Sequence, residues 1–303
     1  MDTENLPPLG VFLLLILFMM VGAGIGSGLG YLAAQLQGLE LNTVITGFNE
    51  QSPVEERNLV RVVNLFSQLF VFTVSSALTA YLVYRQRALH YLRLDRGASV
   101  NILSAAVAFI FGIFIFSQFL YWLNMQLPLP DWANNMEGDA AEMIKGILVM
   151  NSAGEFLLTL FVVAVLPAIG EELLFRGIIQ QQLERMGQNP VLAVWMAAFI
   201  FSAFHLQFAG FFPRLFLGAG LGYLYLWSRS LWVPILAHFF INGMQIAGQY
   251  IQKNALAEST IEDVNWWATG LSVLLIAGLS YYLYQHYLTK VKPTEAEETP
   301  LQP

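Results

Sequence analysis

The sequence predicts an all-α fold, a polytopic membrane helical bundle of about eight transmembrane helices. Of the 303 residues, 56% are hydrophobic and only 12% are charged, about half the charged fraction of a soluble globular domain. Apolar runs long enough to cross a hydrocarbon core of ~30 Å recur along almost the whole chain. Cysteine is absent, so any chemistry must rest on other side chains.

Each expected spanning helix is an apolar run bounded by polar residues or proline. The eight expected positions are 9–36, 59–84, 100–123, 154–180, 190–208, 211–228, 231–251 and 265–287. No basic residue precedes the first run, which is also longer than the core of a signal peptide, so we interpret it as a retained span. The segment 131–153 predicts a short amphipathic helix at the membrane interface.

Small residues indicate where helices approach each other closely. Gly22, Gly26 and Gly30 recur one turn apart in the first span, and Gly218 and Gly222 do so in the sixth. Such spacing is typical of close helix packing in membranes. We therefore expect these glycines to face neighbouring helices.

The loop charges predict the orientation. An even number of spans places both termini on one side, and the Lys and Arg residues divide accordingly. On the side of the termini lie Arg85, Arg87, Arg93, Arg96, Arg185, Arg229, Lys290 and Lys292; on the other lie Arg57, Arg61, Lys145, Arg214 and Lys253. The larger group predicts cytoplasmic N- and C-termini in the cell membrane. The net charge of −7, with no basic face, argues against a nucleic-acid partner.

Charged residues follow the fourth apolar run without a break. The sequence LPAIGEELLFRG places Glu171, Glu172 and Arg176 in one expected helix. Each charge near the centre of a spanning helix costs ~2.5–3.5 kcal/mol on insertion scales, which favours a paired, interior environment. Glu172 and Arg176 are spaced for an ion pair, and a membrane-boundary role is the simpler interpretation of that pair. Glu171 has no such explanation.

Further polar side chains lie in later apolar runs. Phe201 and His205 are one turn apart in FIFSAFHLQF, and His238 and Asn242 share a helix face in VPILAHFFINGMQ. A carboxylate and an imidazole can deprotonate water, while donors stabilise the oxyanion of peptide hydrolysis. Glu171, His205 and His238 are equally candidate ligands of a catalytic Zn²⁺ with an open position for water. The sequence leaves both mechanisms open.

The three elements E171-E172-x-x-x-R176, F201-x-x-x-H205 and H238-x-x-x-N242 closely resemble the motifs of the CPBP family, also called the Abi family, of CAAX proteases and bacteriocin-processing enzymes. The resemblance covers about residues 150–250. It implies an eight-helix intramembrane endopeptidase in which Glu171 and His205 activate water. His238 and Asn242 would bind the oxyanion, and Glu172 and Arg176 would support them.

This resemblance suggests three parts of the chain. Residues 1–145 hold the N-terminal spans and loops, 146–288 a CAAX-protease-like catalytic core, and 289–303 a disordered cytoplasmic tail. The expected partners are the lipid bilayer and a peptide or membrane-protein substrate. The substrate, its prenylation, the pathway and the oligomeric state do not follow from the sequence.

Two other functions fit the same residues. A non-catalytic immunity or scaffold protein would share the fold without turnover. A transporter would use Glu171, His205 and His238 as an ion or proton site, but the sequence has no pair of related halves with broken helices. For the peptidase, the turn MGQNP near Gln188 predicts a hairpin that brings Glu171 and His205 to one depth, within ~8 Å.

Overall fold

A computed structural model describes residues 6–252 and 264–292, and these residues form helices without any strand. The all-α prediction is confirmed. The α-helices are α1 (Pro8–Leu36), α2 (Leu41–Gly47), α3 (Val54–Ser67), α4 (Ser75–Tyr84), α5 (Ala88–Tyr91), α6 (Val100–Met125), α7 (Asp131–Leu148), α8 (Ala153–Leu160), α9 (Leu166–Leu174), α10 (Gln181–Gly187), α11 (Pro190–Phe204), α12 (Phe211–Ser228), α13 (Trp232–Gln252) and α14 (Trp266–His286). Shorter 3₁₀ and π-helical stretches are η2 (Gln68–Val74), η3 (Arg85–Arg87), η4 (Phe161–Val165), η5 (Phe175–Gln180) and η6 (Tyr287–Val291).

Five helical stretches are long and apolar enough to cross a membrane. They are Pro8–Leu36, Val54–Tyr91, Val100–Met125, Ala153–Gly187 and Trp266–Val291. Helices α11, α12 and α13 occupy the three other expected positions. A helix is therefore present at every expected position, and the protein is a multi-pass membrane protein; the count of eight spans stays a prediction.

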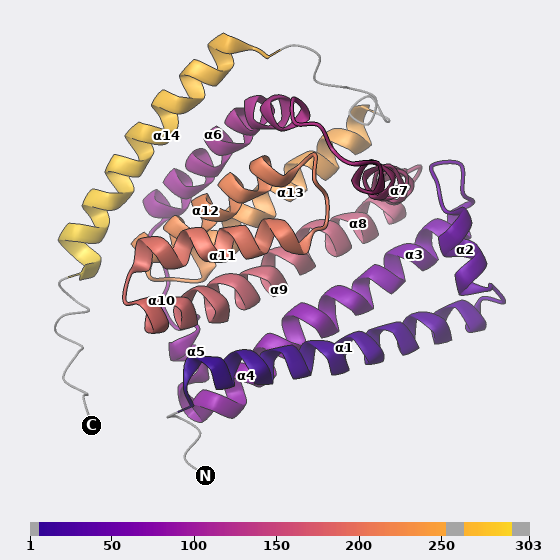
Figure 1. Cartoon of the computed structure of the whole chain (residues 1–303), viewed down its shortest axis with the longest axis horizontal. Helices are drawn as coiled ribbons and strands as arrows, with labels where there is room; N and C mark the ends of the chain where they lie inside the picture. The colour runs from indigo at the N-terminus through magenta and orange to yellow at the C-terminus, as the bar shows by residue number, and fades with distance from the viewer. Residues whose placement is uncertain (1–5, 253–263, 293–303) are drawn as a thin grey trace.

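The outer helices present apolar side chains to their surroundings. Figure 1 shows α14 on the outside of the bundle next to α6, with α1 and α3 on the opposite side. Leu9, Leu13 and Met20 of α1 are exposed, as are Leu271 and Leu274 of α14. Lipid contact explains this exposure, because isolated soluble domains rarely show such large apolar surfaces.

Three expected boundaries are corrected. Helix α11 ends at Phe204 rather than 208, because Leu206 adopts a left-handed conformation (φ 52°) and His205 caps the helix. The fourth span continues to Gly187. The expected tail from 289 starts in a helix, since η6 extends to Val291 and the ring of Tyr287 packs beneath Arg229; residues 293–303 lie outside the described residues.

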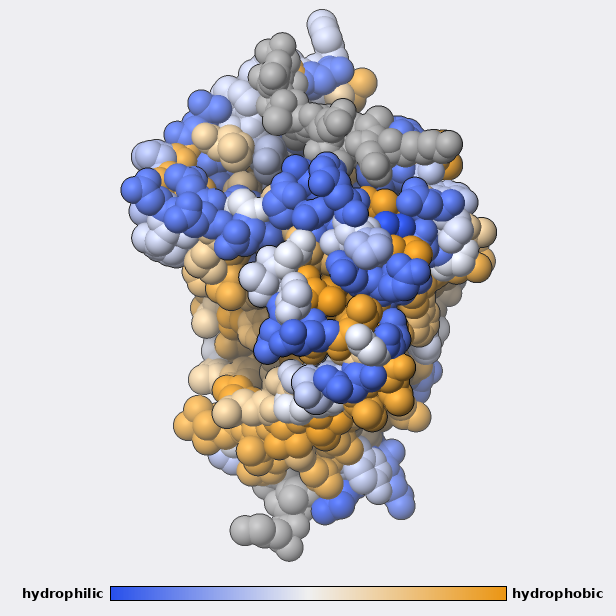
Figure 2. Space-filling view, turned by 90° about the vertical axis from the view of Figure 1, so that its right-hand side faces the viewer, coloured by the Kyte–Doolittle hydropathy of each residue, from blue (hydrophilic) through white to orange (hydrophobic). Residues whose placement is uncertain are grey.

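The segment 131–153, expected to form a helix at the membrane interface, is helical over most of its length. Helix α7 covers residues 131–148, within the predicted 131–153. It lies at one end of the bundle with α2 (Figure 1). Figure 2 looks onto this end, where hydrophilic residues gather across the middle and hydrophobic residues form the flank below them. The position of α7 at a membrane interface stays a prediction.

The glycines of α1 form a close helix contact. A Cβ atom on Gly22 would lie 2.5 Å from the backbone oxygen of Phe70, and one on Gly26 would lie 3.1 Å from that of Phe66. One on Gly30 would lie 3.1 Å from Val63. The packing prediction is confirmed, and it extends to Gly218 and Gly222, which approach α11 in the same way.

Two long helices run parallel through the bundle, the one from α3 to α4 and the one from α8 to α10. At one end Arg57 and Arg61 pair with Glu155, at 2.8 Å and 3.0 Å. Near the middle, a Cβ on Gly170 would lie 2.7 Å from the hydroxyl of Thr73, and at the other end Gln182 donates to Tyr84. The numbering rises along both helices together, so the first helix supports the second over its whole length.

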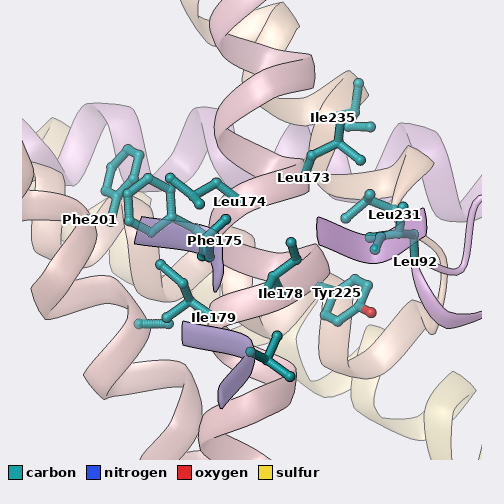
Figure 3. Close-up of a cluster of buried hydrophobic side chains, with 14 of the residues drawn as sticks. Leu92, Leu173, Leu174, Phe175, Ile178, Ile179, Phe201, Tyr225, Leu231 and Ile235 are labelled. Atoms are coloured by element: carbon teal, nitrogen blue, oxygen red, sulfur yellow. The ribbon is translucent and has the colours of Figure 1, made fainter. Parts of the chain in front are cut away.

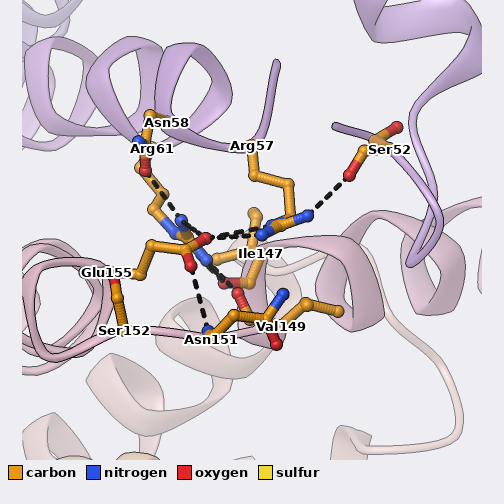
Figure 4. Close-up of polar contacts among 9 residues, drawn as sticks. All are labelled: Ser52, Arg57, Asn58, Arg61, Ile147, Val149, Asn151, Ser152 and Glu155. Carbon is orange, nitrogen blue, oxygen red and sulfur yellow. Dashed lines mark hydrogen bonds and ion pairs between the residues drawn. The ribbon is translucent and has the colours of Figure 1, made fainter. Parts of the chain in front are cut away.

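The network around Glu155 is buried (Figure 4). Arg61 also donates to the backbone carbonyls of Ile147 and Val149, and the Asn151 N–H donates to Glu155 at 2.9 Å. A buried charge needs such partners, because an unpaired one costs several kcal/mol. These contacts hold residues 147–151, which precede α8, against α3. They therefore fix the position at which α8 begins.

At the opposite end lies the segment between α4 and α6, which carries Arg85, Arg87, Arg93 and Arg96. The Leu231 N–H donates to the Arg93 carbonyl at 3.2 Å, and the Trp232 indole donates to the Leu94 carbonyl at 2.9 Å. Arg185 contacts the carbonyl of Leu6 near the chain start. The loops that we assigned to the side of the termini therefore do lie together, whereas the identity of that side as cytoplasmic stays a prediction.

Candidate functional site

The site lies on a helix that is buried on every side. Every residue from Glu171 to Gln180 is buried, across the end of α9 and all of η5. Figure 3 shows Leu173, Leu174, Phe175 and Ile178 of this stretch packed among side chains of neighbouring helices. A helix that is buried all round is enclosed by protein. This burial argues against charges that are simply exposed to water at a membrane boundary, and their depth in the membrane stays a prediction.

Glu172 lies at the centre of the polar contacts. Its Oε1 atom accepts a hydrogen bond from Arg176 Nη1 at 2.7 Å and one from His238 Nδ1 at 2.8 Å. The second arginine amino group donates to the backbone carbonyl of Gly218 at 2.7 Å. The exposed fractions are 0% for Glu172, 1% for Arg176 and 3% for His238. The predicted pair of Glu172 and Arg176 is confirmed, and it joins α9, η5, α12 and α13.

Glu171 differs from its neighbour. Its side chain is 6% exposed, and no hydrogen bond or ion pair within the described residues ends on its carboxylate. It interacts electrostatically with His238, Glu172 and Arg176. A buried carboxylate without a protein partner is costly to maintain, so Glu171 is the acid at this site that the fold itself does not explain.

His205 follows the end of α11 and lies against the ring of Phe201. As the C-cap residue of α11, its Nδ1 atom lies 2.8 Å from the carbonyl of Phe201. A carbonyl only accepts, so Nδ1 carries the proton and Nε2 of the neutral ring keeps its lone pair. His205 interacts electrostatically with His238. The residue His205 is exposed, whereas Glu171, Glu172, Arg176 and His238 are buried.

The ring of Phe201 connects these groups. Its centroid lies 4.9 Å from that of His205, 6.3 Å from that of His238 and 5.1 Å from the guanidinium carbon of Arg176. His238 is a common electrostatic neighbour of Glu171 and His205. No hydrogen bond joins Glu171 to His205 in the described part of the chain, and their close approach stays a prediction.

Asn242 is held one helical turn from His238. Its Nδ2 atom donates to the backbone carbonyl of Val163 at 3.2 Å. Val163 belongs to the π-helical stretch η4, where the backbone pattern departs from that of an α-helix. Such π-helical stretches are frequent at functional sites, and η5 holds Arg176 in a second one.

The local sequence explains the hairpin in which α11 packs back against α10 and η5. Gln188 adopts a left-handed conformation (φ 51°), the side chain of Asn189 accepts from the Leu192 N–H at 3.1 Å, and Pro190 is the first residue of α11. These are typical signals of a helix end followed by a helix start. The predicted hairpin around MGQNP is therefore confirmed.

A metal ion was one expectation for this site. With Nδ1 occupied, Nε2 is the free nitrogen on both histidines, an arrangement that also occurs in metal ligands. Within the described residues, however, no three His, Cys, Asp or Glu side chains are close enough together to hold a metal. A role for a metal at Glu171, His205 and His238 therefore stays a prediction.

Three features of the site did not follow from the sequence: two backbone carbonyls that accept hydrogen bonds, and the side chain of Glu137, which binds the loop after His205. The Gly218 carbonyl accepts a hydrogen bond from Arg176, and the Val163 carbonyl accepts one from Asn242. For Gly218, the glycine spacing was the only available signal in the sequence. Glu137 of α7 holds the loop after His205, with hydrogen bonds of 2.8 Å and 3.2 Å from the N–H groups of Phe208 and Ala209. No pattern in the sequence links residue 137 to that loop.

The fold and the site define a polytopic helical membrane protein with a buried Glu–Arg–His cluster. Residues 153–244, which include all six predicted site residues, match the Rce1-like family, described as type II CAAX prenyl endopeptidase Rce1-like. The family resemblance drawn from the three motifs is thereby confirmed for this part of the chain.

The chain is also similar to an uncharacterized protein, YpbD, of Bacillus subtilis (strain 168). The two are 30% identical over 97 residues, which is 30% of this chain and 47% of the relative. The chain thus spans about half the length of this curated relative. No solved structure matches the chain.

Proposed function

We propose that this protein is an intramembrane endopeptidase that hydrolyses a peptide bond with water activated by Glu171 and His205. The observation that carries the proposal is the carboxylate of Glu171, which is buried and accepts no hydrogen bond from the described residues. A carboxylate kept free in this way can take a proton from water. The match to the Rce1-like family supports the same reaction class.

The contacts of each side chain suggest its role. Glu171 would accept a proton from water, whose oxygen attacks the carbonyl carbon of the substrate. The lone pair on His205 Nε2 would help to orient that water. The C–N bond then breaks, and the departing nitrogen takes the proton.

The developing oxyanion needs donors. His238 donates through Nδ1 to Glu172 at 2.8 Å, which fixes the orientation of the ring. An imidazolium ring held in this way would present its Nε2–H to the oxyanion. Asn242 would supply a second N–H, since only one of its amide hydrogens is used on Val163. Glu172 and Arg176 would act as positioning residues.

Hydrolysis in ¹⁸O-labelled water tests the proposal. The purified protein, reconstituted in lipid vesicles, is incubated with a solubilised membrane-protein fraction, and new C-termini are sought by mass spectrometry. We expect ¹⁸O-labelled C-termini with the wild type and with Glu142→Ala, whose exposed carboxylate pairs with Lys145 at the surface. Glu171→Ala should give none and should retain uncleaved substrate on purification. Equal cleavage by Glu171→Ala would refute the assignment.

Absence of labelled C-termini with the wild type would instead favour the non-catalytic immunity or scaffold function. Substrate retained by both the wild type and Glu171→Ala would then identify the bound partner.

A further inference from the structure

The loop Leu206–Gly210 directly follows His205, and side chains from other helices form hydrogen bonds with it. Glu137 of α7 accepts hydrogen bonds from two consecutive N–H groups, those of Phe208 at 2.8 Å and Ala209 at 3.2 Å. The ring of Trp132 meets that of Phe208 edge-on at 5.3 Å. Helix α7 is therefore attached to this loop through one half-buried carboxylate and one aromatic contact.

Asn124, at the end of α6, holds the same loop from another side. Its Nδ2 atom donates to the Phe208 carbonyl at 2.8 Å, and its Oδ1 atom accepts from the Phe212 N–H at 3.1 Å. Asn124 is buried. A short loop held at both its donors and its acceptors loses most of its freedom, because a buried amide is expensive to leave unpaired.

Arg214 fills the inside of the loop. Its guanidinium donates to the side chain of Gln207 at 2.8 Å and to the Gln207 carbonyl. A Cβ on Gly210 would overlap this guanidinium. Arg214 also interacts electrostatically with both Glu137 and His205. The charge of Arg214 is thus close enough to influence both the Glu137 carboxylate and the His205 imidazole.

His205 depends on this arrangement because it lies at a junction. The helix stops at Phe204, and Leu206 immediately reverses the chain with φ 52°. Beyond the loop, Ser202 donates to the Phe211 carbonyl at 2.7 Å, which closes the loop onto the end of α11. A displacement of the loop therefore moves the residue at its base, and displacements of ~1 Å can cost an enzyme ~10²-fold in rate.

We propose that Glu137 is a positioning residue for His205, and that α7 sets the imidazole in place through the two N–H groups of the loop. This inference rests on the proposed function only for its effect on turnover. The tether is a separate claim about structure. The carboxylate of Glu137 is the part of this attachment that α7 supplies through hydrogen bonds. Its removal breaks both bonds and leaves in place the Trp132–Phe208 ring contact and the buried cluster around Glu172.

The test compares Glu137→Ala, Glu137→Gln and Glu142→Ala. Glutamine keeps an oxygen that accepts from N–H groups, whereas alanine does not. Glu142 lies on the same helix with an exposed carboxylate and serves as the matched control. Protein labelled on its four histidines is studied by NMR, with the His205 signal assigned from its loss in His205→Asn.

We expect one His205 signal at the same position in the wild type, Glu137→Gln and Glu142→Ala, and a shifted or split signal in Glu137→Ala. Hydrogen exchange of the Phe208 and Ala209 amides should accelerate in Glu137→Ala. If that variant does not fold, Glu137→Gln carries the test: its amides should exchange faster than those of the wild type, since a neutral acceptor binds more weakly. Unchanged signals and unchanged exchange would overturn the inference.

The kinetic result separates this inference from the proposed function. With a cleaved substrate in hand, Glu137→Ala should lower kcat roughly 10-fold and leave KM nearly unchanged, and Glu137→Gln should restore most of kcat. A displaced His205 signal with a normal kcat would overturn the positioning role. A wild type without any peptidase activity would overturn the proposed function, and the His205 signal alone would then decide whether Glu137 positions the imidazole.

Discussion

The Nδ1 atom of His238 lies 2.8 Å from the same oxygen of Glu172 that accepts Arg176 at 2.7 Å. One carboxylate oxygen therefore serves a cation and an imidazole, while the other, Oε2, is buried without a partner in the described part of the chain. Glu171, one residue earlier, makes no such contact with the residues that the structure describes. The two adjacent glutamates thus have different physical situations, and we expect their substitutions to act differently.

Glu172→Ala should destabilise the protein by about 3–5 kcal/mol, because it leaves the guanidinium of Arg176 buried without its ion-pair partner and with a hydrogen bond to the Gly218 carbonyl. Thermal unfolding in detergent micelles measures the effect. Glu171→Ala is the matched comparison and should change the stability much less, since its carboxylate holds no partner in place. Equal losses of stability would show that Glu171 has a structural role that its contacts do not reveal.

Metal removal distinguishes the two mechanisms that the sequence leaves open. If Glu171 and His205 activate water directly, peptidase activity should survive exhaustive chelation followed by buffer exchange. Activity that disappears and returns only with added zinc would refute the metal-free mechanism. The assay requires the same substrate before and after chelation, and unfolding curves of both samples show whether the chelator has damaged the fold.

Gly22→Ala should lower stability by about 1–3 kcal/mol, the usual cost of overpacking. The added methyl group would lie 2.5 Å from the Phe70 carbonyl oxygen, so α1 and η2 must separate. Gly24→Ala is the control on the same helix, because no atom lies within 4 Å of its Cβ position. A similar melting temperature for both variants would contradict the close packing of α1 on η2.

Much of this fold follows from the sequence because the signals are long. Apolar runs of about 20 residues predict helices whatever surrounds them, and the signals at Asn189 and Pro190 fixed the hairpin between α10 and α11. The end of α11 did not follow. The apolar sequence continues past Phe204, and only the left-handed conformation of Leu206, stabilised by the tertiary contacts of its loop, ends the helix.

The site was predictable to a similar degree. The costly placement of Glu171, Glu172 and His238 in apolar runs identified them without a structure, and the i,i+4 spacing predicted the contact between Glu172 and Arg176. The hydrogen bond from His238 to Glu172 joins residues 66 positions apart, and neither helix pattern encodes that distance. The contact of Glu137 with the loop at Phe208 is hidden for the same reason.

Asn242 provides the last prediction. Its side chain donates one N–H to the Val163 carbonyl at 3.2 Å, which aims the amide and leaves a second N–H for the oxyanion. Loss of one oxyanion donor typically lowers kcat by ~10²–10³-fold. We expect Asn242→Ala to fall at the lower end of that range, because His238 still donates, and to leave KM nearly unchanged.

Asn242→Asp separates this role from simple packing. Aspartate has almost the same shape as asparagine, but an ionised carboxylate only accepts hydrogen bonds and would repel both the Val163 carbonyl and an oxyanion. We therefore expect a larger loss of kcat in Asn242→Asp than in Asn242→Ala. If Asn242 merely fills space, the order reverses, since the aspartate variant preserves the volume that alanine removes. Steady-state kinetics of the two variants on one substrate decide between these outcomes.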